Sequence, residues 1–434
     1  MTKLQKLRLA SLLILGFFVA SVGFHYWQAA YEGQGYPHAT YLYQPSDCGV
    51  PIEGSKSLVS QISGRHCFGD WFITWAQNVD LDPYRPTLPF VSNYFPFAHT
   101  AMLPFTFSSY PLSITLFLAF LVGSSLVFSW YYFRDRRTDA FENTQLVLIF
   151  GLLNYPMQMA FDRGNVEILV FLFVWGGLAQ YRRRSHLSAF FFAGAAAMKG
   201  FPGIYFGLFL ADRNYRALFY ALLWCAVLTV ASMCLLKGGF SVNLGYMKQS
   251  AQRYASAVGT DSDVFLQHTS SWLGMIRGLG IWAPSLFTKV PGLEWVRANY
   301  AIVRGLLLLA FIVPLLGIRR LQTWQVTSAL TFALVMILPA PFDYRLIFVL
   351  IPFALFINST EHRRSDVWYT SLFSLLLVPK QFFMLNDYIG FGTVLNPLVM
   401  LTMTAMILVD LVRSRKVRIP TLPSMPSAVM ETAR

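Results

Sequence analysis

Charge is scarce in this sequence, because only 13% of its 434 residues are Asp, Glu, Lys or Arg. Apolar residues make up 55%, with 39 Phe and 11 Trp, and the mean hydropathy is +0.49. Soluble globular domains carry roughly 25% charged residues. The shortage of charge therefore argues against a soluble globular protein and indicates a membrane protein.

Cysteine is scarce as well, and the four cysteines have no metal-site spacing. The sequence contains no P-loop, no G-x-S-x-G and no dinucleotide fingerprint. The net charge of +13 lies mostly in short segments beside apolar runs, so it gives no sign of nucleic-acid binding. We expect no metal and no cofactor. Cys48 and Cys67 share one loop, where a disulfide or two free thiols fits their spacing equally well.

Long apolar runs dominate the chain, and they are continuous rather than alternating, which favours helices over a β-barrel. The first run is long for a signal peptide and lacks a cleavage site, so we expect a retained anchor. We predict one all-α polytopic membrane domain over residues 1–434 with ten transmembrane helices. The expected spans are 7–27, 110–133, 144–161, 164–181, 214–236, 299–318, 322–340, 344–358, 366–384 and 391–413.

Basic residues mark the side of the membrane on which the short connections lie. They cluster near residues 3–8, 134–137, 182–184, 319–320, 363–364 and 413–418, and the positive-inside rule makes these segments cytoplasmic. Residues 187–211 are long enough to cross once, but a crossing would place the later basic segments outside. We therefore predict a re-entrant hairpin that enters from the cytoplasm and turns at "KGFPG", Lys199 to Gly203.

Two long loops then face outward, residues 28–109 and 237–298, and residues 414–434 form a cytoplasmic tail. The first loop carries six acidic and three basic residues, and the second carries six basic and three acidic ones. Three acids of the first loop lie in "CFGDWFITWAQNVDLDPYRP". Turn geometry before "PY" accounts for Asp80 and Asp82, whereas Asp70 begins an aromatic segment.

Four polar segments lie at the outward ends of predicted helices and are expected to converge. Asp162 fits either a helix cap or a site residue, and Arg163 and Arg345 fit either interfacial anchors or phosphate ligands. Lys199 at membrane depth indicates a pathway or an ion pair, while His268 also fits a surface position. The segments are "FDRGNVE" (161–167), "QHTSSW" (267–272), "PAPFDYR" (339–345) and "KQFFMLNDY" (380–388).

The order of several motifs carries a family resemblance. "DPY", "SNYFPF", "DRGN", "AAAMKGFPG" and "LPAPFDYR" follow one another between about residues 60 and 360. This order resembles that of the bacterial polyprenyl-phosphate-sugar glycosyltransferases of family 87, within the GT-C superfamily. The sequence departs from the usual family pattern at Phe95 and in the spacing of the lysine and proline of "KGFPG".

The resemblance implies transfer of a sugar, such as mannose or arabinofuranose, from a polyprenyl-phosphate donor to an acceptor hydroxyl. The acceptor is a glycolipid, a polysaccharide or a protein, and the site faces the periplasm from the bacterial cytoplasmic membrane, among membrane lipids. The family places the catalytic base on an acid of the first outer loop, where Asp70 matches best. One carboxylate suffices for an inverting single displacement.

We predict that several polar side chains around Asp70 bind substrate. Cations neutralise the charge of the leaving lipid phosphate, and aromatic rings stack on sugars. The predicted binding residues are Tyr84, Asn93, Asp162, Arg163, Asn165, Lys199, His268, Asp343, Arg345 and Lys380.

A transporter or flippase of lipid-linked sugars is the alternative, because it also needs intramembrane polar residues and a broken helix. Such proteins often show internal repeats and a site near the membrane midplane. This sequence shows no convincing repeat, and its acids cluster in an outer loop. The transferase is therefore favoured, and the alternative stays open.

Overall fold

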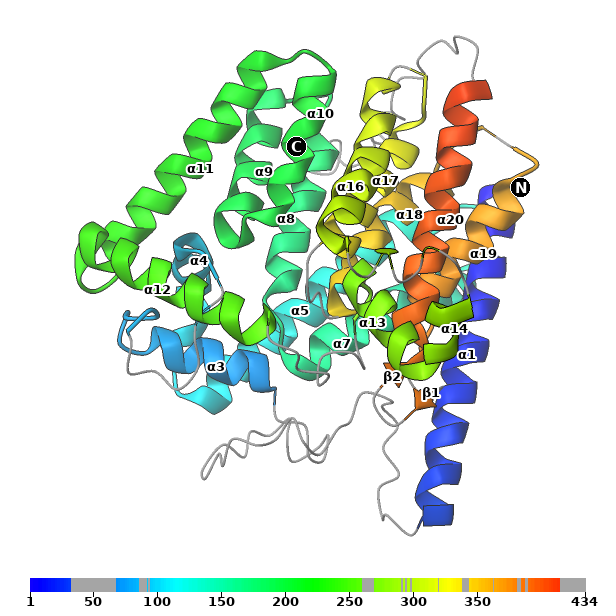
Figure 1. The fold of residues 1–434 in the computed structure, drawn as a ribbon, viewed down its shortest axis with the longest axis horizontal. Helices are drawn as coiled ribbons and strands as arrows, with labels where there is room; N and C mark the ends of the chain where they lie inside the picture. Colours follow the sequence, from blue (N-terminus) through cyan, green and yellow to red (C-terminus); the bar gives the residue numbers. More distant parts are fainter. Residues whose placement is uncertain are drawn as a thin grey trace.

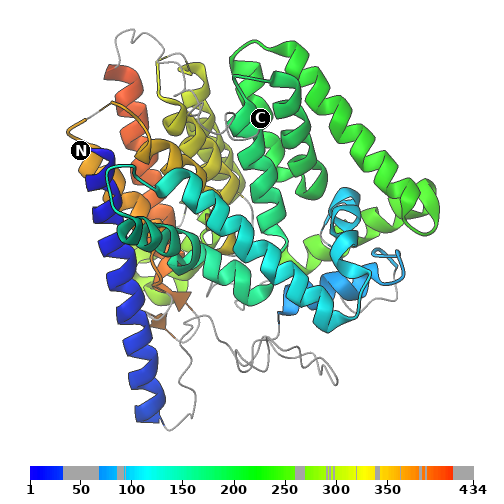
Figure 2. The same cartoon turned by 180° about the vertical axis from the view of Figure 1, so that it is seen from behind.

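The structure is a computed structural model that describes residues 1–32, 68–85, 92, 94–259, 269–289, 292, 295–296, 299–318, 320–337, 343–361, 363–380, 384–386 and 389–413. The described chain is almost entirely helical, and most helices lie side by side in one bundle (Figure 1). α1 (Lys3–Glu32) and α11 (Tyr215–Leu235) form opposite edges of this bundle in both views (Figures 1 and 2). Its largest core draws buried apolar side chains from Leu7 through Ile407, in agreement with the predicted all-α polytopic class.

The first half of the bundle contains the helices up to α11. Most are apolar enough to pack on more than one side, and short polar turns connect them. After α1 they are α3 (Gly69–Asn78), α4 (Pro96–Thr106), α5 (Tyr110–Phe133), α6 (Ala140–Leu148), the π-helix η2 (Ile149–Leu153), α7 (Tyr155–Arg163), α8 (Glu167–Gln180), α9 (Ser185–Lys199), the 3-10 helix η3 (Phe201–Tyr205) and α10 (Phe206–Ala211).

The second half contains the remaining helices and two short strands. The strands form an antiparallel pair, in which Met384 lies opposite Gly390. The elements are α12 (Gly239–Gly259), α13 (Trp272–Trp282), α14 (Pro284–Lys289), α16 (Tyr300–Leu316), α17 (Thr323–Met336), the 3-10 helix η5 (Asp343–Val349), α18 (Leu350–Ile357), α19 (Asp366–Leu377), β1 (Met384–Asn386), β2 (Ile389–Gly390) and α20 (Phe391–Arg413).

Each predicted span coincides with a described helix or a run of helices, but not all keep their predicted lengths. Four helices of the described chain are long and apolar enough to cross a membrane: α1 over Lys3–Phe24, α5, α11 and α20. Shorter apolar helices cover Ala140–Leu153, Glu167–Gln180, Phe201–Ala211, Ile302–Leu316 and Thr323–Met336. The predicted span 366–384 is wrong at its end, because α19 stops at Leu377 and Met384–Asn386 is a strand. Pro379 follows that stop and cannot continue a helix.

The predicted span 144–161 is broken inside the bundle. η2 replaces regular helix over Ile149–Leu153, and the chain restarts at Tyr155, with Pro156 in the first turn of α7. Asn154 caps this restart by accepting a hydrogen bond from the Met157 backbone N–H. Ser125 of α5 donates to the Gly151 carbonyl, which the π-helix leaves available. The break therefore lets α7 approach the next helices at its own angle.

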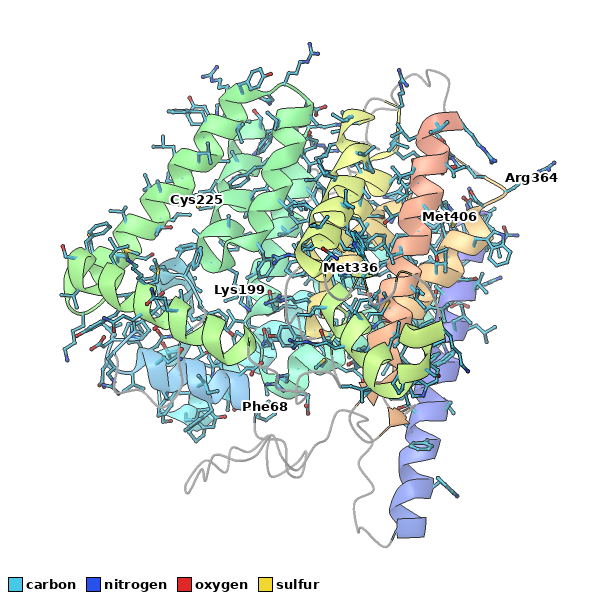
Figure 3. All side chains as sticks on the ribbon, viewed as in Figure 1. Phe68, Lys199, Cys225, Met336, Arg364 and Met406 are labelled. Carbon is cyan, nitrogen blue, oxygen red and sulfur yellow. The ribbon has the colours of Figure 1, made fainter. Side chains whose placement is uncertain are left out.

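The predicted hairpin is present as a fold-back of the chain. α9 runs back along α8, because Ser188 Oγ donates to the Gly177 carbonyl at 2.8 Å near one end. η3 and α10 then return, so that Tyr181 Oη donates to Asp212 at 2.5 Å. Lys199 lies at the far tip (Figure 3). Both ends of the fold-back therefore lie at the same end of the bundle.

Basic connections between helices lie together at one end of the bundle, as the positive-inside argument predicted. Lys3 Nζ donates to the Arg134 carbonyl at 2.8 Å, which joins the start of α1 to the end of α5. Arg363, just before α19, pairs with Asp410 near the end of α20 at 3.0 Å. We refer to this side as the basic end. The orientation of the basic end in a membrane stays a prediction.

The described parts of the two long loops lie at the opposite end. α3 and α4 belong to the first loop, and α12, α13 and α14 to the second, with α12 running across the bundle (Figure 1). The first loop starts later than residue 28, because α1 continues to Glu32. The residue range 414–434 and the Cys48 and Cys67 pair lie outside the described residues.

Candidate active site

Asp70 lies in the first turn of α3 and is bound by side chains from the end of α7. Arg163 Nε lies 2.9 Å from Asp70 Oδ2, and Arg163 Nη2 lies 2.8 Å from Oδ1. Asn165 Nδ2 also donates to Oδ2. Bidentate contacts of this kind fix the orientation of both groups. The Asp70 side chain stays 16% exposed and that of Arg163 20%, so the pair lies at an accessible boundary.

The turn "DRGN" makes this contact possible because of its glycine. Gly164 ends α7 with a φ of 60°, in the left-handed region that glycine adopts without cost. A Cβ at this position would lie 2.7 Å from Trp71 Cβ. The tight approach brings Arg163 and Asn165, on either side of the glycine, to one carboxylate, Asp70. Conformation and space both require glycine here.

A second carboxylate, that of Glu167, lies four positions after Arg163 in the sequence and is fully buried. It begins α8, and its side chain is 0% exposed. Lys199 Nζ, at the hairpin tip, donates to Oε1 at 2.8 Å, and Arg345 Nε, on η5, donates to the same oxygen at 3.2 Å. Buried charges are tolerated when they are paired in this way. Glu167 therefore joins α8, the hairpin and η5 through charge.

Aromatic rings flank the two cations that bind Glu167. Lys199 Nζ lies 4.6 Å from the centroid of the Tyr94 ring, and the guanidinium carbon of Arg345 lies 4.7 Å from that of Phe201. Rings in this position attract a cation through their negative faces. They also restrict where the side chains of Lys199 and Arg345 can point.

A neutral histidine supports the segment that carries Tyr94. His99 Nε2 and Ser92 Oγ are 2.8 Å apart, and His99 Nδ1 and Asn78 Oδ1 are 3.0 Å apart. Burial lowers the pKa of His99 to about 3, so the ring is neutral at physiological pH. Tyr84 Oη donates to the Tyr94 carbonyl at 2.7 Å. The loop is thereby held against the hairpin tip.

The Asp70 and Glu167 groups form one electrostatic cluster, in which two carboxylates face three cations. Burial by itself raises the pKa of the Asp70 carboxyl, but the charge of Arg163 and the hydrogen bonds from Arg163 and Asn165 outweigh it. Lys199 adds to the lowering from its place beside Glu167. The pKa of Asp70 therefore lies below its usual value, and the carboxylate is ionised at neutral pH. We call Asp70, Arg163, Glu167, Lys199 and Arg345 the charge cluster.

Asp343 and Lys380 belong to a neighbouring polar group rather than to the charge cluster. Tyr155 Oη donates to Asp343 Oδ2 at 3.0 Å, and Ser270 Oγ donates to Oδ1. Asn396 donates to Ser270 Oγ at 2.8 Å. Lys380 Nζ is buried and donates to backbone carbonyls at the end of α19, 2.6 Å from the Leu375 oxygen and 3.2 Å from that of Val378. Through Asp343 and Ser270, hydrogen bonds join α7, η5, the segment before α13 and α20.

The remaining predicted site residues have different outcomes. Asp162 lies in the last turn of α7 and does not cap α8, because the first-turn N–H of Glu167 donates to the Asn165 side chain at 2.8 Å instead. Tyr84 is buried and packs its ring edge against His99, away from solvent. Asn93 and His268 lie outside the described residues. Their roles in binding substrate stay predictions.

Three residues near the site were not predicted from the sequence. Glu167 follows "DRGN" directly, and a lone acid at the start of a long apolar helix also fits a favourable charge near the helix N-terminus, which hid its role. Ser270 lies in the polar segment "QHTSSW" but was not itself singled out, and Asn396 gave no sequence signal beyond its polarity. Among the described residues, no three His, Cys, Asp or Glu side chains come together as a metal site. The expectation that the protein uses no metal stays a prediction.

Comparison with known protein families identifies one family whose model matches this chain. The model of glycosyltransferase family 87 matches residues 92–341, a stretch that contains Arg163, Glu167 and Lys199 but not Asp70 or Arg345. None of the curated proteins and none of the solved structures compared with the chain matches it. The family model spans more than half of the 434 residues. The chain therefore belongs to glycosyltransferase family 87.

Proposed function

We propose that the protein transfers a sugar from a polyprenyl-phosphate donor to an acceptor hydroxyl, with Asp70 as the general base. The reaction takes place at the outer face of the bacterial cytoplasmic membrane. The observation that carries this proposal is the charge cluster, where a partly exposed carboxylate lies among more cations than carboxylates. A substrate that brings both a hydroxyl and an anionic phosphate matches that arrangement.

Asp70 suits the role of base better than Glu167. Its carboxylate is 16% exposed, whereas the side chain of Glu167 is 0% exposed and holds two cations on one oxygen. Asp70 is ionised at neutral pH and can take a proton. Hydrogen bonds of catalytic groups often rearrange when substrate binds, so the contact with Arg163 in the free protein is compatible with this role.

The reaction is a single displacement. The acceptor oxygen attacks the anomeric carbon of the sugar, its proton passes to Asp70, and the bond between that carbon and the phosphate oxygen breaks. The lipid phosphate leaves with the bonding electrons, and the configuration at the anomeric carbon inverts. One carboxylate is sufficient, because the leaving phosphate needs charge neutralisation rather than a second acid.

Arg163 and Arg345 are suited to that neutralisation. A guanidinium carries five N–H donors in a planar fork that matches phosphate geometry. Within the described part of the chain, Arg345 donates one hydrogen bond, from Nε to Glu167, and its side chain is 10% exposed. Arg163 is 20% exposed beside the base. Both arginines therefore have room to contact a phosphate at the boundary of the site.

The proposed side of the membrane follows from the distribution of basic residues. The basic end carries the short connections, which favour the cytoplasm. The charge cluster lies at the other ends of the same helices, where the described parts of the long loops gather. A periplasmic site takes a donor presented in the outer leaflet and an acceptor of the cell envelope, either a glycolipid, a polysaccharide or a protein.

A transfer assay tests the proposal. Purified protein in detergent is offered short-chain polyprenyl-phosphate mannose or arabinofuranose with envelope glycolipid, polysaccharide or protein fractions. We expect free polyprenyl phosphate and a mass increase of one sugar in one acceptor fraction, with inverted anomeric configuration by NMR. Transfer from a nucleotide sugar, with every lipid-phosphate donor left intact, would overturn the donor class.

A further inference from the structure

The two oxygens of the Glu167 carboxylate have different surroundings. Oε1 accepts hydrogen bonds from Lys199 at 2.8 Å and from Arg345 at 3.2 Å. Oε2 is buried, and no donor among the described residues reaches it. The side chain as a whole is 0% exposed. One oxygen of this carboxylate is thus engaged, and the other is a buried acceptor without a donor among the described residues.

An open acceptor of this kind is unusual in a folded protein. Buried polar atoms nearly always have a partner, because removing them from water without one is costly. The cost is higher for an ionised carboxylate than for a neutral group. Glu167 belongs to the charge cluster, so a ligand of that cluster is the natural source of the missing donor.

We propose that Glu167 Oε2 accepts a hydrogen bond from the donor sugar, namely from the hydroxyl on the carbon next to the anomeric carbon. This inference rests on the proposed function and deepens it, because it names the part of the substrate that the protein recognises. An ionised carboxylate has only acceptor capacity, so its partner is a donor such as a hydroxyl. The ionised phosphodiester of the donor offers none.

The position of that hydroxyl follows from the arrangement around Oε1. Arg345, which suits the phosphate, contacts one oxygen of Glu167, and the open acceptor belongs to the same carboxylate. A group that reaches Oε2 while the phosphate contacts Arg345 is attached close to the phosphate. On a glycosyl phosphate, the hydroxyl on the adjacent ring carbon meets this condition.

Arg345 is the more accessible of the two cations that contact Oε1. Its contact with Glu167, at 3.2 Å, is the longer of the two, and its side chain is 10% exposed compared with 3% for Lys199. When Arg345 turns toward the lipid phosphate, its guanidinium leaves Oε1 and opens that side of the Glu167 carboxylate to the sugar. Lys199 stays on Oε1 at 2.8 Å and keeps the Glu167 side chain oriented. Phosphate binding and sugar recognition are thereby linked through one arginine.

A double-mutant cycle with donor analogues tests this. Wild-type protein and Glu167→Gln are assayed with polyprenyl-phosphate mannose and with its 2-deoxy analogue. Gln keeps the shape of the side chain and an oxygen for Lys199, but it can no longer offer acceptors at both positions. The loss of kcat/KM on removing the 2-hydroxyl should be about 10- to 100-fold larger in the wild type than in Glu167→Gln, the range for a hydrogen bond to a charged group. Intrinsic reactivity of the analogue cancels in this ratio.

Controls separate recognition from a merely structural role. The 4-deoxy donor should lose equal activity in both proteins, and Asp80→Asn, which changes an exposed acid outside the charge cluster, should behave like the wild type with every donor. Glu167→Asp keeps the charge but withdraws the acceptor, so it should also lose the preference for the 2-hydroxyl. The proposal would be wrong if Glu167→Asp kept the full wild-type preference for the 2-hydroxyl. It would also be wrong if the 4-hydroxyl, rather than the 2-hydroxyl, showed coupling to Glu167.

The remaining outcomes are also decisive. Equal losses in wild type and Glu167→Gln would overturn the inference while leaving the proposed transferase intact. If the wild type consumed no lipid-phosphate sugar at all, the proposed function itself would fail. If neither Glu167 variant accumulates, the test is the binding of the two donors to wild-type protein without acceptor. Equal Kd values for the two donors would overturn the inference.

Discussion

Arg163 holds Asp70 through two nitrogens, with Nη2 2.8 Å from Oδ1 and Nε 2.9 Å from Oδ2. The pair joins a helix of the first long loop to the end of α7, across 93 positions of sequence. It also sets the electrical state of the proposed base, since Arg163 is the strongest influence lowering the Asp70 pKa. The pair thus helps to position α3 and keeps the proposed base ionised.

Asp70→Asn should remove catalysis and spare the fold. Asn keeps the shape and can still bind Arg163 through its oxygen, but it takes no proton near neutral pH. We expect transfer to fall by about 100-fold or more, the scale of a positioned general base, while membrane insertion and donor binding persist. Asp80→Asn is the matched control, because its carboxylate is exposed and pairs only with Arg85 in the bonds described. Near-normal transfer by Asp70→Asn, with Asp162→Asn or Asp343→Asn inactive, would move the base elsewhere.

Arg163→Met should shift the pH dependence of transfer. A lowered pKa keeps the wild-type base ionised to below its ordinary value of about 3.9, and activity is lost only as pH falls through the lowered pKa. Without Arg163, burial dominates and raises the pKa, so the acid limb of kcat/KM should move to higher pH. The rate should also fall by about tenfold or more, because a charge-assisted phosphate contact is lost. Arg85→Met changes an arginine that pairs with Asp80 outside the charge cluster, and it should leave the profile unchanged. An unshifted limb in Arg163→Met would contradict the pairing.

The lowered pKa of Asp70 also determines how the stability of the fold depends on pH. Because the folded pKa of Asp70 is lowered, the pair stabilises the protein above the unfolded pKa of about 3.9, and this contribution is lost as pH falls through the folded value. The difference in thermal stability between wild type and Asp70→Asn should therefore shrink in acid.

Gly164→Ala should destabilise the protein although the change adds a single methyl group. The backbone φ of 60° disfavours any residue with a Cβ, and that Cβ would lie 2.7 Å from Trp71 Cβ. A left-handed conformation costs about 1–2 kcal/mol and overpacking about 1–3 kcal/mol more. Thermal unfolding in detergent measures the loss. Gly123→Ala in α5, where nothing lies within 4 Å of an added Cβ, is the control and should be neutral or stabilising.

Accessibility of introduced cysteines should report the orientation of the bundle. Single cysteines at Gly259 and Asn386 should react with a membrane-impermeant reagent from outside intact cells, in a background without the four native cysteines. Cysteines at Thr138 and Asn214, beside the basic end, should react only after permeabilisation. Labelling of residue 214 from outside would contradict the predicted orientation of the hairpin and of every helix after it.

Apolar run length predicted the helices well, because a chain that places its backbone in lipid must form continuous helices. α5, α11 and α20 begin and end within one residue of the predicted spans 110–133, 214–236 and 391–413. Helix boundaries inside apolar sequence were harder to predict. The apolar residues that follow Lys380 extended the predicted span beyond Leu377, where α19 stops two residues before Pro379. Hydropathy stays high where η2 interrupts the third span, although Pro156 marks the restart of the helix.

The site was predicted in part because outward ends of helices must lie at a common surface. That argument brought Arg163 and Arg345 to one place without any knowledge of their contacts, and the family resemblance added Asp70 of the first outer loop. It could not pair them, because pairing depends on angles between helices and on the tight turn at Gly164. It also passed over Glu167, whose position at a helix start has an ordinary explanation, and only the approach of Lys199 and Arg345 gives it a role.

The sequence distances within the charge cluster imply an order of assembly during synthesis. Glu167 and Lys199 are 32 positions apart, and Asp70 and Arg163 are 93 apart, so both pairs can form once the first 200 residues have entered the membrane. Arg345 is 178 positions from Glu167 and arrives long afterwards. Until then each acid has one basic partner, and the nascent half of the protein holds two balanced ion pairs. The surplus positive charge that suits an anionic lipid enters only with the last third of the chain, so a truncated product folds its first half without acquiring a competent phosphate site.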